Sequence, residues 1–453
     1  MTQGMSEDRE DSVLDERMDS IRVGSEGDIR CGADSVSGSV SQRACVYCGA
    51  RVVLNPITDA FHIVHGPIGC ASYTWDIRGS LTSGSDRYRN SYSTDMTEKN
   101  IIFGGERKLE AAIDEIVAEH SPKLVFVYAT CIAGVIGDDI RAVCKRASEK
   151  HPGARFIPVQ SPGFSGNKAH GYKLACEALM ELMRPHSKVD KNRGVNFLGD
   201  YNLAGEAWIV RSYLERIGIP VVSTFTGDSS HDSLVRAPGA SLNIVQCAGS
   251  MTYLAKCMED EFGIPFTKVS FFGVDDTSAS ILRTAEALGD DECVDRAKAF
   301  IASEEARVAP LLEPYRRALA GKRAAIYVGG GFKAISLIRQ FNSLGMKTVM
   351  VGTQTGSSDE YEIIRRLVSA DTVVLDDANP SELEKFMKEK GADILVGGVK
   401  ERPLAYKLNV AFCDHNHERR RALAGYDGVL NFTEEIHSSI CSPVWGHVGR
   451  KRE

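Results

Sequence analysis

Three cysteines in the first third of the chain stand in settings that suit a metal ligand. Cys70 follows the turn Gly66–Gly69 and opens a predicted helix, where free backbone N–H groups and the helix dipole favour a thiolate. Cys131 follows the apolar run Leu124–Tyr128, which predicts a buried parallel strand, and precedes a turn into a helix. Cys45 lies upstream of both. Thiolates in such settings are typical of proteins that present a ligand to a soft metal ion.

A cubane cluster usually takes four thiolates, so these three leave one position open. Cys48 is an internal candidate, because it forms a Cys-x-x-Cys pair with Cys45, and Cys31 is another. A single pair of this kind does not by itself indicate a zinc site. Four further cysteines lie in helical-looking segments and are expected to be packing residues: Cys144, Cys176, Cys257 and Cys293.

The elements that must position these residues follow an alternating pattern. From residue 121 onward, short β-branched runs alternate with longer amphipathic segments, which is typical of βαβ units and parallel sheets. The predicted strands form three blocks: 124–128 and 155–159; 194–199, 220–225 and 241–246; 323–328, 347–351, 372–375 and 394–396. The predicted helices are 137–150, 203–217 and the charged region 291–320. We therefore predict α/β domains over residues 41–190, 191–320 and 321–453.

The 453 residues carry a net charge of −7 that is concentrated at the N-terminus. Residues 1–40 hold ten acids against four arginines, which predicts an acidic tail that is mobile or folds only on a partner. No basic stripe with interleaved aromatic residues indicates a nucleic-acid partner. No apolar run approaches the ~20 residues that span a bilayer, and the first residues lack a hydrophobic signal segment, so a cytoplasmic location is expected.

Three glycines, Gly329, Gly330 and Gly331, follow the predicted strand 323–328. They do not form Gly-x-Gly-x-x-Gly, and no Gly-Lys-Ser/Thr follows a glycine-rich loop, so nucleotide binding is not indicated. One interpretation is a tight strand-to-helix turn. The other is a site where backbone amides approach a ligand closely, as in phosphate and iron–sulfur sites.

Motifs along the chain add a family resemblance. They are His65–Cys70, Tyr73–Gly79, Ser93–Asp95, Ile102–Glu106, Cys131 with Ile136–Asp139, Pro158–Phe164, Leu242–Cys247, Gly398–Lys407 and Asp414–Glu418. Together they resemble the nitrogenase component 1 family from about residue 40 to the C-terminus. The resemblance implies three Rossmann-like parallel-sheet domains around a metal-cluster cavity, with the glycine turn at its border. It also implies a [4Fe–4S] cluster shared with a homologous partner subunit in an α2β2 heterotetramer, the partner giving the fourth thiolate and Cys48 lying buried.

Within the family, two branches differ at the cofactor. The catalytic subunit holds its finished cofactor by one cysteine and one histidine. The matching cysteine here is Cys247, but the histidine position is Ala424, and the histidine pair expected after Gly163–Gly166 is absent. Arg78 matches an arginine that lines the cofactor cavity.

The resemblance thus implies a scaffold for assembly of the iron–molybdenum cofactor, without independent enzymatic turnover. The scaffold would receive an iron–sulfur precursor from a donor protein and host the insertion of molybdenum and homocitrate with the nitrogenase iron protein. It would then pass the product to apo-nitrogenase component 1. A catalytic nitrogenase-like reductase, a protein that only stores clusters and a vanadium-system paralogue remain alternatives.

Several cationic and histidine residues are candidates at this second site. Arg78, Lys407 and Lys400 would neutralise an anionic cluster and homocitrate, because cations in a water-poor cavity bind carboxylates strongly. The alternative is ordinary ion pairing. His415 and His417 would form either a transient metal port or a hydrogen-bonded loop.

Overall fold

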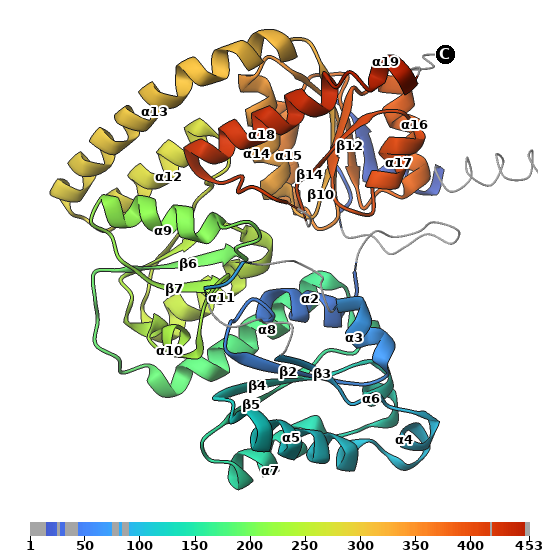
Figure 1. The fold of residues 1–453 in the computed structure, drawn as a ribbon, viewed down its shortest axis with the longest axis vertical. Coiled ribbons are helices and arrows are strands. Elements are labelled where there is room, and N and C mark those ends of the chain that lie inside the picture. Colours follow the sequence, from blue (N-terminus) through green and yellow to red (C-terminus); the bar gives the residue numbers. More distant parts are fainter. Residues whose placement is uncertain are drawn as a thin grey trace, which may run out of the picture. The chain divides into compact units, whose positions relative to one another are not determined.

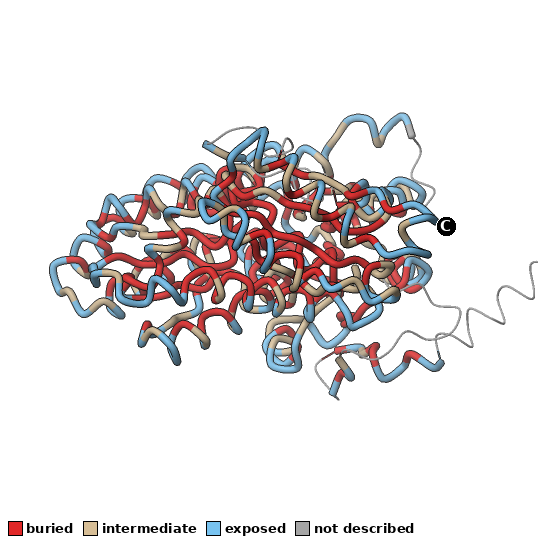
Figure 2. Tube along the Cα trace, turned by 90° about the horizontal axis from the view of Figure 1, so that it is seen from below, coloured by how far each residue is buried: buried red, intermediate tan, exposed pale blue. Residues whose placement is uncertain are grey.

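The computed structural model describes residues 15–24, 28–31, 44–74, 81–83, 90–416 and 419–448. The chain forms two compact units, which are described in turn. One unit comprises residues 44–269 and 281–297 and contains two four-stranded sheets. The other comprises residues 1–43, 270–280 and 298–453 and contains a six-stranded sheet. Buried residues follow the strands, and exposed residues follow the outer faces of helices (Figure 2).

The first sheet has the strand order β3-β2-β4-β5, and all its strands are parallel. Its strands are β2 (Ala60–His65), β3 (Ser91–Ser93), β4 (Leu124–Ala129) and β5 (Arg155–Gln160). The helices around it are α2 (Val46–Leu54), α3 (Ile68–Thr74), α4 (Glu98–Phe103), α5 (Glu106–His120), α6 (Cys131–Ile136), α7 (Ile140–Lys150) and α8 (Lys168–Met183) (Figure 1). Since the chain leaves β2 for β3 on one side and then crosses to β4, the topological switch point lies between β2 and β4.

The second sheet repeats this topology in the order β7-β6-β8-β9. Its strands are β6 (Val195–Asp200), β7 (Val221–Thr226), β8 (Leu242–Val245) and β9 (Phe266–Lys268). Its helices are α9 (Glu206–Arg216), α10 (His231–Leu234) and α11 (Ala248–Phe262), and α12 (Val274–Ala287) and α13 (Asp291–Leu319) follow. The switch point lies between β6 and β8.

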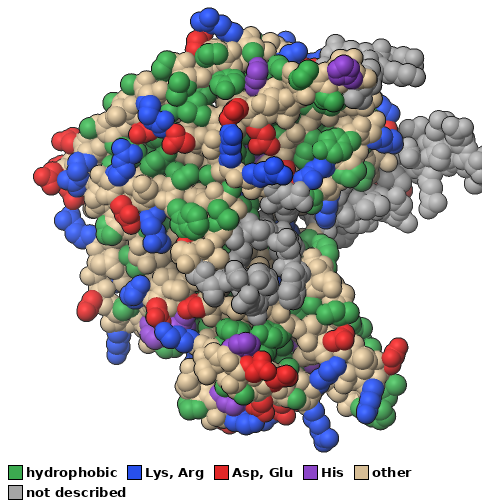
Figure 3. Space-filling model, viewed as in Figure 1, with side chains coloured by type: hydrophobic (Ala, Val, Ile, Leu, Met, Phe, Trp, Pro, Cys, Tyr) green, Lys and Arg blue, Asp and Glu red, His purple; other side chains and the backbone are tan. Residues whose placement is uncertain are grey.

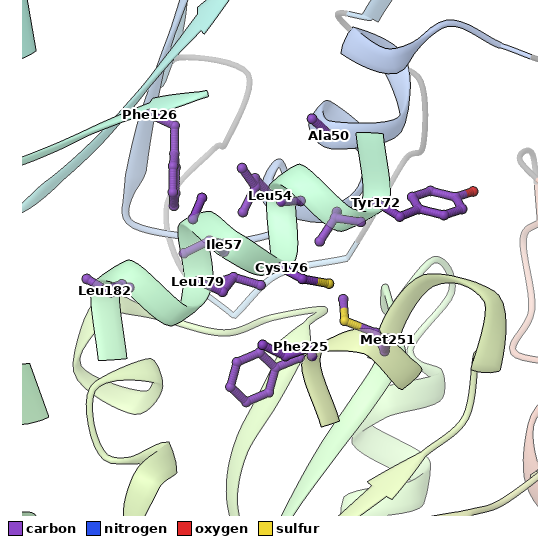
Figure 4. Close-up of a cluster of buried hydrophobic side chains, with 14 of the residues drawn as sticks. Ala50, Leu54, Ile57, Phe126, Tyr172, Cys176, Leu179, Leu182, Phe225 and Met251 are labelled. Carbon is purple, nitrogen blue, oxygen red and sulfur yellow. The ribbon is translucent and has the colours of Figure 1, made fainter. Parts of the chain in front are cut away.

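Helix α8 joins the two sheets of this unit into one hydrophobic core. It packs against α2 and β5 of the first sheet and against α11 of the second. Figure 4 shows Cys176 and Leu179 of α8 between Leu54 of α2 and Met251 of α11. Burial of such apolar area stabilises the fold by about 25 cal/mol per Å², so α8 fixes α2 and α11 within one rigid body.

The six-stranded sheet of the other unit has the order β1-β12-β11-β10-β13-β14. Its strands are β1 (Ile21–Val23), β10 (Arg323–Val328), β11 (Lys347–Thr353), β12 (Val373–Asp376), β13 (Ile394–Gly397) and β14 (Ala411–Asp414). Its helices are α14 (Gly331–Ser343), α15 (Ser358–Leu367), α16 (Pro380–Lys390), α17 (Arg402–Lys407), α18 (Gly425–Ile440) and α19 (Trp445–Val448). Strands β10 to β14 are parallel and doubly wound, with the switch point between β10 and β13.

Part of the predicted mobile tail is ordered in this unit. Ile21–Val23 forms β1, an edge strand antiparallel to β12. Arg17 is buried beside it, where its Nε donates to Glu382 and its Nη2 donates to the carbonyls of Asp376 (2.8 Å) and Asp377 (3.1 Å). For these residues the prediction of a mobile tail is wrong, because composition averages hide a short apolar strand and one buried ion pair.

The predicted fold class, an α/β protein with three parallel-sheet blocks, is confirmed. Each predicted strand is present within two residues of its expected ends. The strand Ala60–His65 was missed, although it is central to the first sheet. The domain boundaries 41–190, 191–320 and 321–453 stay a prediction. No helix in the described part of the chain is long and apolar enough to cross a membrane.

Candidate metal centre

Parallel pairing of β2 and β4 places two of the three candidate thiols at one sheet edge. His65 at the end of β2 pairs in register with Ala129 at the end of β4. Cys70 follows in α3, and Cys131 is the first residue of α6. Both cysteines therefore lie beyond the carboxyl ends of neighbouring strands at the switch point, where open α/β sheets bind ligands.

A close contact between the two following turns brings them together. Thr130 donates to the carbonyl of His65 from its backbone nitrogen (3.2 Å) and from its hydroxyl (3.0 Å). A Cβ added at Gly66 would lie 2.0 Å from the Thr130 Oγ1, so only glycine fits there. The Gly66 turn is thus explained by its approach to the turn that carries Cys131.

The buried ring of His65 holds this turn from the other side. Its Nε2 lies 2.9 Å from Asp138 Oδ2, and its Nδ1 lies 3.1 Å from the Thr94 hydroxyl. Burial lowers the pKa of His65 and outweighs the opposing effect of Asp138. The neutral ring then donates from Nε2 to the carboxylate and accepts from Thr94.

Gly163 joins the third thiol to this site. It follows β5, and its backbone N–H donates to the Cys131 Sγ at 3.1 Å. A Cβ added at Gly163 would lie 3.0 Å from the Cys131 Sγ and 3.2 Å from the Cys45 Cβ. Cys45 itself precedes α2 and pairs with Asn167 in an isolated β-bridge. Gly163 therefore lies against both Cys131 and Cys45, and Cys70 is close enough to these two thiols for them to affect its pKa.

The predicted preference of Cys70 for the thiolate form is wrong for the metal-free chain. Burial raises the pKa of the Cys70 thiol, and the neighbouring Cys131 and Cys45 raise it further, while a hydrogen bond with Thr130 lowers it. Helix α3 is only seven residues long, so its dipole does not offset these effects. Three neighbouring thiolates would repel one another. They are expected to stay deprotonated only when cations are bound, because metals bind the thiolate form.

The donor set fits a cluster better than a single ion. Within the part of the chain that the structure describes, no three His, Cys, Asp or Glu side chains are grouped to hold one metal ion. A cubane places each thiolate on a different iron, so its ligands stand further apart. Cys48 is buried in the hydrophobic core at 1% exposure, and Cys31 belongs to the other unit, beside Ser358.

Cys247 occupies the corresponding place in the second sheet. It follows β8 and is the N-cap residue of α11, at the β6/β8 switch point. A Cβ added at Gly199, which has φ +86°, would lie 2.6 Å from the Cys247 nitrogen. The glycine at the end of β6 thus lets Cys247 lie directly against that strand.

The glycine turn of the third sheet lies at the β10/β13 switch point. Side chains added at Gly329 and Gly330 would meet open space. A Cβ at Gly331 would lie 2.6 Å from the Glu360 Cβ, and Glu360 accepts a hydrogen bond from the Phe332 amide at 2.8 Å. The start of α14 is therefore already capped by an acid of its own chain, so part of this turn has a structural explanation.

The predicted cationic residues divide among different settings. Arg78 lies outside the described residues. Lys407 ends α17, and its Nζ lies 2.8 Å from Glu384, which also binds Lys388. Its side chain is 67% exposed, in keeping with the mixture of acids and bases over the face drawn in Figure 3. Lys400 is exposed next to α17. Roles for these residues at a cofactor stay a prediction.

The histidine loop is half described. His415 is fully buried between Phe272 and Phe432, and neither of its ring nitrogens has a hydrogen-bond partner in the described structure. Burial, with help from Lys333 and Arg419, lowers the pKa of His415 well below its usual value, so the ring is neutral. His417 lies outside the described residues. Ala424, which matches the histidine of the catalytic branch, is fully buried before α18.

Three residues beside the thiol site were not singled out from sequence: Thr130, Gly163 and Tyr47, whose hydroxyl bonds Thr74 of α3 at 2.6 Å. Gly163 belongs to the motif Pro158–Phe164, so only its role was missed. Thr130 precedes a candidate ligand, which is a position worth testing in any such motif. Tyr47 carries no sequence signal.

Comparisons with known proteins converge on one family. The model for nitrogenase component 1 type oxidoreductases matches residues 45–441. The nitrogenase iron-molybdenum cofactor biosynthesis protein NifE of Clostridium pasteurianum is 65% identical, covering 96% of this chain and 97% of that protein. The protein of the same name from Methanosarcina barkeri is 49% identical, covering 94% and 95%. A solved structure, nitrogenase Cp1 at pH 5, matches with a TM-score of 0.89 at 30% identity, covering 97% of each chain.

Proposed function

The chain belongs to the nitrogenase component 1 type oxidoreductase family, and from that premise we propose that it is a scaffold subunit for assembly of the iron–molybdenum cofactor. The NifE relatives carry that role in their names. The observation that carries the proposal is the contrast between two sites. Three thiols meet at the first sheet, while the second sheet presents Cys247 and the chain has Ala424 where the catalytic branch has a histidine.

The first site would hold a permanent [4Fe–4S] cluster. Cys45, Cys70 and Cys131 supply three thiolates, and the homologous subunit NifN supplies the fourth in an α2β2 heterotetramer. Burial of Cys48 in the core supports a ligand from outside the chain. The backbone N–H of Gly163 would donate to the coordinating Cys131 sulfur, which stabilises the thiolate.

The second site would hold cargo. Cys247 would anchor an iron–sulfur precursor at one end, leaving the other end open to molybdenum and homocitrate. As separate proposals, Arg78 and Lys407 would offset the negative charge of an anionic cofactor, and the open backbone at Gly329 and Gly330 would let amides approach one. An anchor of one thiolate permits release, whereas two strong ligands would retain the product.

The partners follow from this role. A precursor-donating protein would load the scaffold, the nitrogenase iron protein would take part in insertion of molybdenum and homocitrate, and apo-nitrogenase component 1 would receive the product. The chemistry is maturation of a cofactor rather than turnover of an external substrate. The vanadium-system paralogue is distinguished by which heterometal the scaffold accepts.

The test is reconstitution with the purified heterotetramer. Loaded with precursor and supplied with the iron protein, molybdate and homocitrate, it should yield a cofactor that activates apo-nitrogenase, with molybdenum found by metal analysis. Acetylene reduction at a nitrogenase-like rate would instead show a reductase, and failure to accept precursor would show a storage protein. Ala424→His should slow release of the cofactor if the added imidazole reaches iron.

A further inference from the structure

Arg51 is a buried guanidinium with no acidic partner among the described residues. It lies on α2 and is 1% exposed. Its Nη2 donates to the Ser91 hydroxyl, but its Nε and Nη1 have no hydrogen-bond partner. Its Cζ lies 5.6 Å from the centroid of the Tyr128 ring. A buried charge strongly disfavours the folded state unless an opposite charge lies near. We therefore expect an anion close to Arg51.

Arg17 shows how the same chain treats another buried arginine. It is 6% exposed, and it has a carboxylate from Glu382 and two backbone carbonyls as partners. That guanidinium is neutralised by its own unit. Arg51 has a hydroxyl and an aromatic ring in place of an acid, so the two residues differ in charge compensation rather than in burial.

The missing anion has a place close to Arg51. Cys45 immediately precedes α2, and Arg51 lies six residues further along, so about 9 Å of helix rise separates the two backbone positions. Tyr47, one turn before Arg51, donates its hydroxyl to Thr74 at 2.6 Å, and Thr74 donates to the Cys70 carbonyl at 3.2 Å. The Tyr47 ring also packs edge-on against Tyr128.

The Tyr128 ring links the two places. Arg51 Cζ lies 5.6 Å from its centroid, and the Tyr47 ring packs edge-on against it at 5.8 Å. Tyr128 belongs to β4 and stands three residues before Cys131. Charges within about 10 Å are little screened by salt, and less so when buried.

We propose that Arg51 is the internal counter-charge of the iron–sulfur cluster held by Cys45, Cys70 and Cys131, and that it raises the reduction potential of that cluster. This rests on the permanent cluster of the proposed function. Cluster potentials depend on net charge and surroundings. Since one-electron reduction adds a negative charge, a buried cation stabilises the reduced form more than the oxidised form.

The first test measures the potential. The heterotetramer is prepared anaerobically with wild-type chain, Arg51→Met, Arg51→Lys and the paired-arginine control Arg17→Met, and each is titrated with dithionite while the cluster is followed by electron paramagnetic resonance. Arg51→Met should shift the midpoint to more negative potential, while Arg51→Lys and Arg17→Met should stay near wild type. An unchanged midpoint in Arg51→Met with full iron content overturns the proposal, as does an equal shift in Arg51→Lys.

The second test measures thermal unfolding of cluster-loaded and chelator-treated complexes. Arg51→Met should lower the melting temperature of the loaded form but raise it in the stripped form, because the stripped form then loses an uncompensated charge. Equal destabilisation of both forms would mean that Arg51 acts by packing alone and would overturn the proposal. Arg17→Met should destabilise both forms.

If Arg51→Met accumulates poorly in cells, its iron content is compared with that of Arg51→Gln, which keeps a hydrogen-bond donor for Ser91, and of Arg51→Lys. Loss of iron in the two neutral variants with retention in Arg51→Lys supports a counter-charge. Loss of iron in all three overturns it. If the wild-type complex itself binds no cluster, the proposed function fails, and the stripped-form comparison still reports whether Arg51 is uncompensated.

Discussion

The first and third sheets both have a topological switch point between parallel strands, but the side chains at their carboxyl edges differ. At the β2/β4 switch point, Cys131 and Cys45 lie against Gly163 with Cys70 nearby, and no ion pair with these cysteines is present among the described residues. At the β10/β13 switch point, the start of α14 is capped by Glu360, and Lys407 is paired with Glu384. Among the described residues, the thiols at the first edge therefore have no cationic side chain paired with them. The helix start and the lysine at the third edge are already paired with acids of the chain.

Under the proposed function, this difference would distinguish a permanent ligand from an exchangeable one. A site without internal partners gains most from a group that stays, because without that group the thiols repel one another and Arg51 lacks an anion. A site whose charges are already paired can bind a ligand by exchanging partners and can reverse the exchange at low cost.

The largest effect is expected from removing one of the three cysteines of the first site. Replacing Cys45, Cys70 or Cys131 by Ala should remove most of the permanent iron and loosen the heterotetramer, because bound metal stabilises the assembled state. Iron per chain and sedimentation of the complex measure both effects. Cys48→Ala is the matched control, since Cys48 is buried one turn from Cys45. Full iron in all three variants would refute the assignment, and iron loss in Cys48→Ala would move the fourth ligand into this chain.

The next largest effect is expected from Cys247→Ala, which tests whether the precursor and the permanent cluster are held by different cysteines. Cys247→Ala should leave the permanent cluster spectroscopically intact while lowering precursor retention and cofactor yield severalfold. Cys257→Ala, further along α11, should change neither quantity. Loss of the permanent cluster in Cys247→Ala, or normal retention of precursor, would show that Cys247 is not the anchor.

Sequence reasoning predicted most of the strands, whereas its ligand assignments stay predictions. Alternation of apolar runs predicted most strands, because fully buried parallel strands read as continuous β-branched segments. Ala60–His65 was missed because two histidines interrupt its apolar pattern, although both side chains are buried in the structure. Periodicity cannot distinguish a histidine that is buried with partners from one at the surface.

The electrostatics of the site were less predictable. The start of a helix suggested a thiolate at Cys70, yet burial and two nearby thiols decide its pKa. Lys407 was chosen for its motif, and its pairing with Glu384 depends on packing of α17 against neighbouring elements. Arg51 gave no signal at all, because nothing in a sequence shows that an arginine lacks an acid.

A smaller effect is expected from crowding the thiol site. Gly163→Ala adds a Cβ 3.0 Å from the Cys131 sulfur, which is closer than ordinary contact and next to the hydrogen bond that Gly163 donates. We expect a cost of about 1–3 kcal/mol, seen as faster iron loss to a chelator. Gly153→Ala is the control, because its added Cβ meets nothing within 4 Å. Equal chelation rates in the two variants would mean that the thiols have room to move.

The third sheet offers a test that involves no metal. Glu401 follows β13, is 3% exposed and accepts from the Gly398 amide at 2.8 Å, while its Oε1 has no partner in the described structure. Burial raises the pKa of Glu401 to about 7, against the lowering effects of the Gly398 and Glu401 amides and Lys400, and Asp414 raises it slightly. Protonation would satisfy the buried carboxyl better than ionisation does.

The sign of the pH dependence follows from this shift. The folded pKa of Glu401 lies above the unfolded value of 4.5, so the folded state binds the proton more tightly. The contribution of this proton to the free energy of unfolding is therefore fully present below pH 4.5 and is lost as the pH rises through 7. The loss is on the order of 3 kcal/mol. Glu401→Gln should remove this decline from denaturant unfolding curves, whereas Glu389→Gln, at an exposed position of α16, should keep it. A Glu401→Gln variant with the wild-type pH profile would mean that the third-sheet edge admits water to this carboxylate, and the contrast between the two edges would then lie in their ligands rather than in their burial.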